Sequence, residues 1–410
     1  MRPKAKWTFM AYLAGENNLS AAGDKDLAEM RTVGSTADVN VVVEFDNAGT
    51  RGTNRYHVQH NGAGERVESL GETDSGDPQT LIDFIRWAAG NYPADRYALI
   101  LWNHGGGWEP AEIDRIARSV GVRQYNEREA SERSASALGK VFFRATLQTI
   151  FSLPSPADRA ICSDDGSGHS LDTIELSRVL AQAVDILGQP LDLLGMDACL
   201  MSNLEVSYQV RPYVRYIVAS EETEPGDGWP YAAVLRGFVD HPDLPTPGLA
   251  AHIVRAYIQS YVDQGYTGPV TQSAFDVARV KEAAEPLDHL AEQLGARMPG
   301  AGDNLWTAQR KSAHFYHNTL WDIAHLCEEL STLTSDDSIR RAAEEVRAAL
   351  QTGPGRFVIA EAHNGPRVDR CGGISIYLLP PLTDISRYYA DLEYAKDHRW
   401  WAMLQAYHAV

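Results

Sequence analysis

The sequence predicts an α/β protein with a mostly parallel sheet flanked by helices, followed by a mainly helical C-terminal region. Continuous apolar runs rich in β-branched and aromatic residues are typical of strands buried on both faces, and helical patterns lie between these runs. Alternating strands and helices favour a parallel sheet with right-handed crossovers. The strand-like runs lie at 7–14, 39–46, 97–103, 191–197 and 216–220.

Helical periodicity predicts helices at 20–32, 78–90 and 172–187. In the last of these, Asp172 and Glu175 have the spacing of a capping box.

After about residue 245 the sequence pattern changes from alternating strands and helices to mainly long amphipathic helices. We therefore divide the chain into an α/β domain, 1–245, and a mainly helical subdomain, 246–410, packed on it. The subdomain is predicted to contain long helices and then a closing pair of strands. The predicted helices are 248–264, 279–297, 303–330 and 336–351, and the predicted strands are 356–362 and 373–379.

One segment, 109–160, interrupts the alternation of predicted strands and helices. It is rich in Arg, Glu, Ser and Ala and is too long for an ordinary connection. We interpret it as an insertion whose middle is exposed and open to proteolysis.

Composition excludes several classes of function. With 44% hydrophobic and 22% charged residues the chain is an ordinary globular one. Its net charge of −18 opposes binding to nucleic acid or to an anionic membrane, and it favours basic partners. The apolar run after MRPKAK is short and contains Thr8 and Tyr12, so we interpret it as a buried strand and expect a cytoplasmic protein.

Four cysteines (Cys162, Cys199, Cys327 and Cys371) are widely separated and form no CxxC pair. This spacing argues against a disulfide framework or a zinc knuckle. A small buried residue is the simplest interpretation of any one of them.

Two reactive residues follow predicted strands. His104 comes directly after YALILWN and precedes three glycines, which allow close backbone approach. Cys199 directly follows LDLLGMDA and is predicted to begin a helix, LMSNLEVSYQV, whose dipole would favour the thiolate. Each residue alone could be structural. Together they indicate thiol-dependent acyl transfer, because the carboxyl ends of parallel strands meet at one rim.

The strings WTFMAYLAGENNL, LILWNHGGGW, ICSDDGSG, LDLLGMDACLMSNLEV and SEETEPGDGWPY resemble, in this order, clostripain-type cysteine peptidases, which are relatives of the caspases. The similarity runs over about residues 7–235 and is diffuse beyond them. It implies a caspase-like fold.

The resemblance implies that Cys199 attacks the scissile carbonyl and His104 protonates the leaving amine. The N–H groups of Gly105 and Cys199 would bind the oxyanion. Asp197 would lie in S1, the pocket for the residue before the scissile bond (P1), and would select Arg or Lys. Alternatively, Asp197 only caps the following helix.

Three acids in the loop after the next strand (Glu221, Glu222 and Asp227) add negative potential at the cleft or are solvated charges.

Many clostripain relatives are zymogens that are cut between the two catalytic residues. The resemblance therefore implies processing within 109–160, by the enzyme itself or by an upstream protease; an uncut helical insertion is the alternative. The candidate cleavage residues are Arg115, Arg118, Arg123, Arg128, Arg133, Lys140 and Arg144. Some relatives bind calcium, but the loop at 163–169 lacks EF-hand spacing, and we expect no required cofactor.

Two rival functions stay open. His314, His317 and His325 suggest a metal hydrolase, although their spacing is not that of the zincins. A catalytically silent scaffold that binds partner proteins is the second rival, which the presence of both His104 and Cys199 opposes. The predicted partners are protein or peptide substrates with a basic P1 residue.

Overall fold

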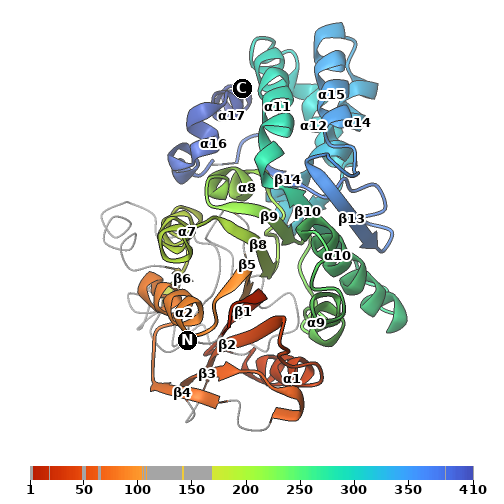
Figure 1. Ribbon diagram of the computed structural model, residues 1–410. Coiled ribbons are helices and arrows are strands. Elements are labelled where there is room, and N and C mark those ends of the chain that lie inside the picture. The colour runs from red at the N-terminus through yellow and green to blue at the C-terminus, as the bar shows by residue number, and fades with distance from the viewer. Residues whose placement is uncertain are drawn as a thin grey trace, which may run out of the picture.

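A computed structural model describes residues 3–17, 19–48, 52–62, 66–103, 105, 108, 141–142, 169–383 and 385–409. Within these residues, nine strands form one mixed sheet in the order β13-β10-β9-β8-β5-β1-β2-β3-β4 (Figure 1). Helices cover both of its faces. The α/β class predicted from the sequence is confirmed.

The centre of the sheet is parallel, and its strands coincide with the five predicted runs. Nearly all of their residues are buried, as expected for strands covered on both faces. Their carboxyl ends therefore lie along one edge of the sheet. In chain order these strands are β1 (Ala5–Gly15), β2 (Val39–Asn47), β5 (Ala94–Trp102), β8 (Leu191–Asp197) and β9 (Val214–Ala219).

Antiparallel strands extend the sheet at both sides. β3 (Thr53–His57) and β4 (Arg66–Gly71) follow β2, and β10 (Val270–Asp276) and β13 (Val358–Asn364) follow β9. The outermost strand β4 is mostly exposed and carries charged side chains, which discourage pairing with another chain.

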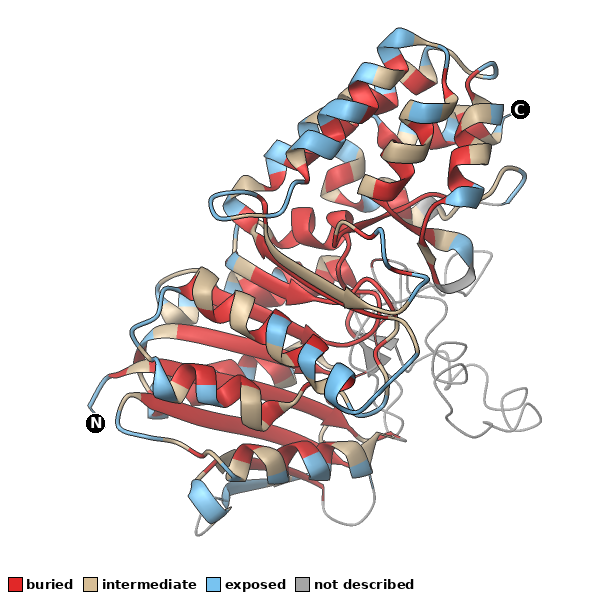
Figure 2. Cartoon of the chain, turned by 90° about the vertical axis from the view of Figure 1, so that its right-hand side faces the viewer, coloured by how far each residue is buried: buried red, intermediate tan, exposed pale blue. Residues whose placement is uncertain are grey.

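Two helical layers enclose the sheet, as Figure 2 shows by the buried strands between helices with exposed outer faces. Successive side chains of β1 point to opposite faces of the sheet and pack against different layers. Trp7 and Phe9 pack against the layer of α1, α9 and α10. Met10 and Tyr12 pack against the layer of α2, α7 and α8. The helices of the first layer are α1 (Ser20–Arg31), α9 (Tyr231–Asp240) and α10 (Thr246–Asp263). Those of the second are α2 (Pro78–Asn91), α7 (Thr173–Leu187) and α8 (Leu204–Val210).

The C-terminal helices share the apolar core of the second layer. They are α11 (Val280–Gly295), α12 (Gly302–Lys311), α13 (Tyr316–Thr319), α14 (Ile323–Leu333), α15 (Asp337–Ala349), α16 (Glu393–Asp397) and α17 (Trp400–His408). Short 3-10 turns occur at His60–Gly62, Val277–Arg279 and Arg387–Asp391. In the described part of the chain, no helix has the length and apolar character needed to cross a membrane.

The predicted helix 303–330 is wrong, because α12 ends at Lys311 and α14 begins only at Ile323. The Asp322 carboxylate begins α14 by accepting the His325 N–H at 2.6 Å, whereas apolar spacing alone does not reveal the break. The intervening residues form β11 (His314–Phe315), the short helix α13 and β12 (Leu320–Asp322), and the two strands join β14 (Ser375–Tyr377) in a small sheet.

The predicted closing strand pair is also wrong. β13 joins β10 in the main sheet, whereas β14 joins β12 in the small one. A further short pair, β6 (Val141–Phe142) and β7 (His169–Ser170), is parallel. The division at residue 245 stays a prediction, and strands from both sides of it form the main sheet.

The small sheet holds the segment that follows β8. The Ser375 N–H donates to the Ser202 carbonyl at 3.0 Å. The buried Glu205 carboxylate accepts the Tyr377 N–H at 3.0 Å and the Tyr389 hydroxyl at 2.8 Å. The C-terminal region therefore fixes the chain that leads away from Cys199.

Candidate active site

The ends of β5 and β8 lie side by side. Trp102 is the register partner of Asp197, and the Asn103 N–H donates to the Asp197 carbonyl at 3.2 Å. The Asn103 side-chain amide also donates to the Ala14 carbonyl at the end of β1. Because these strands are parallel, the residues that follow Trp102 and Asp197 emerge at the same edge of the sheet.

Cys199 lies at this edge, almost completely buried. Its Sγ accepts the Glu224 N–H at 3.2 Å, and the thiol faces the Glu224 carbonyl at 4.0 Å. Burial raises the pKa of the thiol to about 12, although the N–H groups of Glu224, Gly105 and Cys199 favour the thiolate. In this arrangement the sulfur carries a proton, so it needs a proton acceptor to become a nucleophile.

The predicted helix dipole at Cys199 is wrong. α8 begins at Leu204, and its N-cap is Asn203, whose side chain accepts the Val206 N–H. Between them, Leu200 has a φ of 65°, and its N–H donates to the Glu222 carbonyl. Hydrogen bonds to neighbouring loops thus replace the first helical turn, and helix polarity does not lower the pKa of the thiol.

Gly105 lies against the backbone of Cys199. A Cβ at this position would lie 2.3 Å from the Cys199 carbonyl oxygen and 3.0 Å from its nitrogen. Only glycine allows this approach without a backbone shift. The predicted oxyanion donors, the N–H groups of Gly105 and Cys199, thus both lie beside the sulfur.

His104 lies outside the described residues, as do Gly106 and Gly107. Its flanking residues Asn103 and Gly105 are described, and both contact the residues just after β8 or at its end. The assignment of His104 as the partner of Cys199 stays a prediction.

Asp197 is buried below the thiol. One carboxylate oxygen accepts the Tyr231 hydroxyl at 2.8 Å and the Trp229 N–H at 3.3 Å. Desolvation raises the pKa of this carboxyl above its usual range. Because its partners are Trp229, just before α9, and Tyr231, the first residue of α9, and because Asn203 caps α8, the alternative that Asp197 caps the following helix is wrong.

Glu224 is a site residue that the sequence analysis missed. Its carboxyl group lies against that of Asp197, its backbone contacts the Cys199 sulfur, and Gln272 donates to it at 3.4 Å. Burial and the negative charge of Asp197 raise the pKa of Glu224 well above its usual range. Two carboxyl groups so close share a proton when no cation is present.

A third buried acid, Asp26, extends this negative region. It accepts the Trp102 indole N–H at 2.7 Å. Burial, and then the charge of Asp197, raise the pKa of Asp26 to about 8. The sequence offers no local signal for this residue, because it lies on α1, far from the strand ends in the chain.

A narrow pocket of about 40 Å³ joins the thiol to the acids. Gly228, with a φ of 57°, forms part of its wall, and a Cβ there would lie 3.3 Å from both Asp197 carboxylate oxygens. Its lining is Leu19, Trp102, Asn103, Asp197, Ala198, Cys199, Glu224, Pro225, Gly226 and Gly228.

The acids singled out in the following loop have different environments. Glu221 and Glu222 are buried, so the alternative of solvated charges is wrong for them, and neither lines the pocket. Asp227 is exposed and pairs with Lys25 at 2.6 Å. In this loop, therefore, Glu224 is the acid that lies in the pocket.

The histidines of the rival metal site do not form a helical pair. His314 is in β11, where its ring lies at a tilted angle to that of Trp321, and His325 Nδ1 accepts the Ala313 N–H at 3.0 Å. The side chain of His317 lies outside the described residues. The prediction that His314 and His317 share a helix face is therefore wrong.

The segment 109–160 is outside the described residues except for Val141–Phe142. All the candidate processing residues lie in the part that is not described. Cys162 and most of the 163–169 loop are also outside the described residues.

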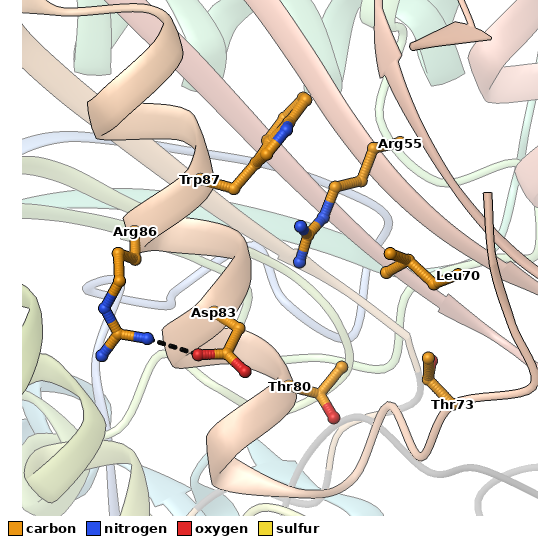
Figure 3. Close-up of a pocket in the computed structure, with 7 residues that line it drawn as sticks. All are labelled: Arg55, Leu70, Thr73, Thr80, Asp83, Arg86 and Trp87. Carbon is orange, nitrogen blue, oxygen red and sulfur yellow. Dashed lines mark hydrogen bonds and ion pairs between the residues drawn. The ribbon is translucent and has the colours of Figure 1, made fainter. Parts of the chain in front are cut away.

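A second, larger pocket of about 450 Å³ lies between α2 and the β3–β4 edge (Figure 3). Arg55 points into it beside Trp87, and its guanidinium pairs with Glu44 at 2.6 Å. Asp83 and Arg86 pair with each other on α2. Its lining residues include no cysteine or histidine, so the chemistry described above lies at the Cys199 pocket.

The chain is similar to known proteins in sequence and in fold. The sequence profile of the clostripain family matches residues 11–132 and 152–406. Clostripain of Hathewaya histolytica is 28% identical over 264 residues, which are 56% of this chain and 41% of that protein. The chain therefore matches less than half of the length of this curated relative.

Two solved structures have a similar fold over 97% of this chain and 99% of their own. One is a secreted C11 cysteine protease from Bacteroides thetaiotaomicron in complex with an irreversible peptide inhibitor, with a TM-score of 0.65 and 19% identity. The other is an inactive zymogen C11 protease from Parabacteroides distasonis, with a TM-score of 0.66 and 19% identity. They support the predicted caspase-like fold class.

Because Gly105 lies against the Cys199 backbone, we expect its substitution to lower the free energy of unfolding. Gly105→Ala forces the two backbones apart, and we expect it to cost about 1–3 kcal/mol, as overpacking does. Gly90→Ala is the matched control, because a Cβ on Gly90, within α2, meets no atom within 4 Å and alanine favours helix. Thermal unfolding measures both; a Gly105→Ala variant as stable as Gly90→Ala would contradict the contact.

Proposed function

Because the chain belongs to the clostripain family of cysteine peptidases, we propose that it hydrolyses peptide bonds after Arg, using Cys199 as nucleophile and His104 as its proton-transfer partner. One observation carries the proposal: two buried carboxyl groups, Asp197 and Glu224, lie in the pocket that opens beside the Cys199 thiol.

In the proposed reaction, Cys199 Sγ attacks the carbonyl carbon of the P1 residue and its proton passes to His104. The N–H groups of Gly105 and Cys199 stabilise the oxyanion. His104 then protonates the departing amine, leaving a thioester that water hydrolyses to restore the thiol. The buried thiol supports this order, because its raised pKa keeps the sulfur protonated until the acceptor is in place.

The pocket chemistry favours a P1 guanidinium. Asp197 and Glu224 together offer a carboxyl pair to a planar fork of N–H donors, and a bound cation replaces the proton that they share. Arg fits such a pair better than Lys, whose ammonium is a compact point charge. The narrow pocket requires the Pro225–Gly228 wall to move outward when the side chain enters.

This proposal predicts the pH dependence of cleavage. Both carboxyl groups have a raised pKa, so they carry protons at low pH and lose them as pH rises. A guanidinium binds the ionised pair, whereas neutral citrulline of the same shape gains nothing from ionisation. We expect the ratio of kcat/KM for an Arg peptide to that for its citrulline analogue to increase as pH rises above the usual range of carboxyl pKa values.

In this ratio of kcat/KM values, the pH dependence that comes from ionisation of Cys199 and His104 cancels, because both substrates are cleaved by the same dyad. Asp197→Asn and Glu224→Gln should flatten it and lower kcat/KM for the Arg peptide about 10- to 100-fold, the value of one charge-assisted hydrogen bond. Asp227→Asn, in the same loop but exposed, is the matched control and should leave the ratio unchanged. Equal cleavage of both peptides at every pH would refute Arg recognition.

We further propose that the enzyme is a zymogen activated by cleavage after a basic residue in 109–160. The segment is long, contains several Arg residues, and lies between His104 and Cys199 in the chain. A solved neighbour from Parabacteroides distasonis is described as an inactive zymogen. Cleavage by the enzyme itself or by an upstream protease fits this proposal, and action inside the cell stays a prediction from the N-terminal pattern.

Intact-mass analysis of the wild type beside Cys199→Ala tests self-processing. We expect wild-type protein to yield two fragments that meet within 109–160, while Cys199→Ala stays full length. If both stay whole after incubation, self-processing is wrong. A chain that shows no turnover even after deliberate nicking of this segment would instead favour the non-enzymatic scaffold.

A further inference from the structure

A second cluster of chemically active side chains lies on the other side of the loop that carries Glu224. Glu221, Asp322 and Cys371 each place one ligand atom within 4.8 Å of the others, and all three are buried. Glu221 follows β9, Asp322 ends β12, and Cys371 precedes β14, so the cluster joins the main sheet to the small sheet (Figure 1).

Glu221 is the unsatisfied member of this cluster. Its side chain is fully buried, and neither carboxylate oxygen accepts a hydrogen bond of normal geometry from the described residues. It faces the Asp322 carboxyl group and the Gly373 N–H. A buried carboxylate that faces only one poorly aligned donor is costly unless a proton or a cation neutralises it.

The other two members are placed to share such a ligand. The Asp322 oxygens accept the His325 and Gly372 N–H groups, each at 2.6 Å, and this fixes the orientation of its carboxylate. Cys371 is a free thiol. Among the described residues, neither Glu221 nor Asp322 forms an ion pair with Lys, Arg or His, so no side-chain cation neutralises the pair.

From this geometry we propose that Glu221, Asp322 and Cys371 bind a structural zinc ion. Two carboxylates with a thiolate suit Zn²⁺, whereas Ca²⁺ and Mg²⁺ take oxygen ligands alone. In a tetrahedral site completed by a water molecule, with bonds of about 2.0–2.3 Å, ligand atoms lie about 3.5 Å apart, so the three ligand atoms, which lie within 4.8 Å of one another, approach by at most about 1 Å on binding.

The surroundings also fit a metal site. The backbone donors to Asp322 act as the outer hydrogen bonds that orient metal ligands. Glu361, which pairs with His363 at 2.5 Å, adds negative charge beside the cluster. Binding releases the thiol proton of Cys371 and any proton shared by the two carboxyl groups, leaving three anionic ligands on one dication. The alternative is that Glu221 and Asp322 only share a proton.

The zinc ion would position the active-site loop. Glu221 is followed directly by Glu222, whose carbonyl accepts the Leu200 N–H at 3.3 Å, and then by Glu224, whose N–H contacts the Cys199 sulfur. Fixing Glu221 therefore fixes the segment that lines the substrate pocket. This role is independent of which P1 residue the enzyme accepts.

Zinc binding is best measured on untagged, full-length Cys199→Ala protein, because that background removes the catalytic thiol as a competing ligand. After metal removal and gel filtration, ZnCl₂ titration should give one tight site per chain, and Zn²⁺ should raise Tm. In this background Glu221→Gln and Cys371→Ser should weaken the site more than about 10-fold. Cys327→Ser, which removes a buried thiol outside the cluster, should retain it.

Cobalt provides a second readout. Co²⁺ should give a thiolate charge-transfer band that disappears in Cys371→Ser and persists in Cys327→Ser, while circular dichroism shows that both variants are folded. Absence of bound zinc and of this band would overturn the proposal and leave the shared proton as the explanation. Zinc that binds equally to the Cys371→Ser and Glu221→Gln variants would also overturn it. Both readouts are independent of peptide cleavage.

Discussion

The parallel register of β5 and β8 is the constraint on which the site depends. It places Trp102 beside Asp197, so the two loops that carry reactive residues leave the sheet at adjacent points. Gly105 can then lie against the Cys199 backbone, which a side chain would prevent. The apolar burial of both strands holds this register, because a shift by one residue would turn side chains packed in one helical layer toward the other layer.

The same burial that fixes the strands also determines the electrostatics of the site. Cys199, Asp197 and Glu224 are all removed from water, so the free pocket disfavours a thiolate and two carboxylates at once. A bound Arg side chain would stabilise the two buried carboxylates, and a correctly placed base would accept the proton of the buried thiol. Without substrate, the site is protonated and its pocket, bounded by the Pro225–Gly228 wall, is narrow. The charged forms of the thiol and the acids are therefore favoured only when a substrate binds.

The sequence revealed the central strands because strands buried on both faces are continuous apolar runs, and strand ends pointed to Cys199. It did not reveal the break between Lys311 and Ile323, since apolar spacing there continues as if helical. Glu224 was not among the loop acids singled out, because nothing local in the sequence shows that a loop acid is buried. Glu221 and Cys371 are far apart in the chain, so only the packing of the two sheets brings them together.

If Asp197 and Glu224 direct an Arg side chain to Cys199, a reagent that carries Arg should alkylate this thiol selectively. Alkylation by a peptide acyloxymethyl ketone with Arg at P1, followed by peptide mapping, tests this most directly. We expect one adduct per chain, on Cys199, formed at least about 10-fold faster than with citrulline at P1 and slowed by Asp197→Asn. Equal rates for the two reagents, or an adduct on Cys327 or Cys371 instead, would contradict it.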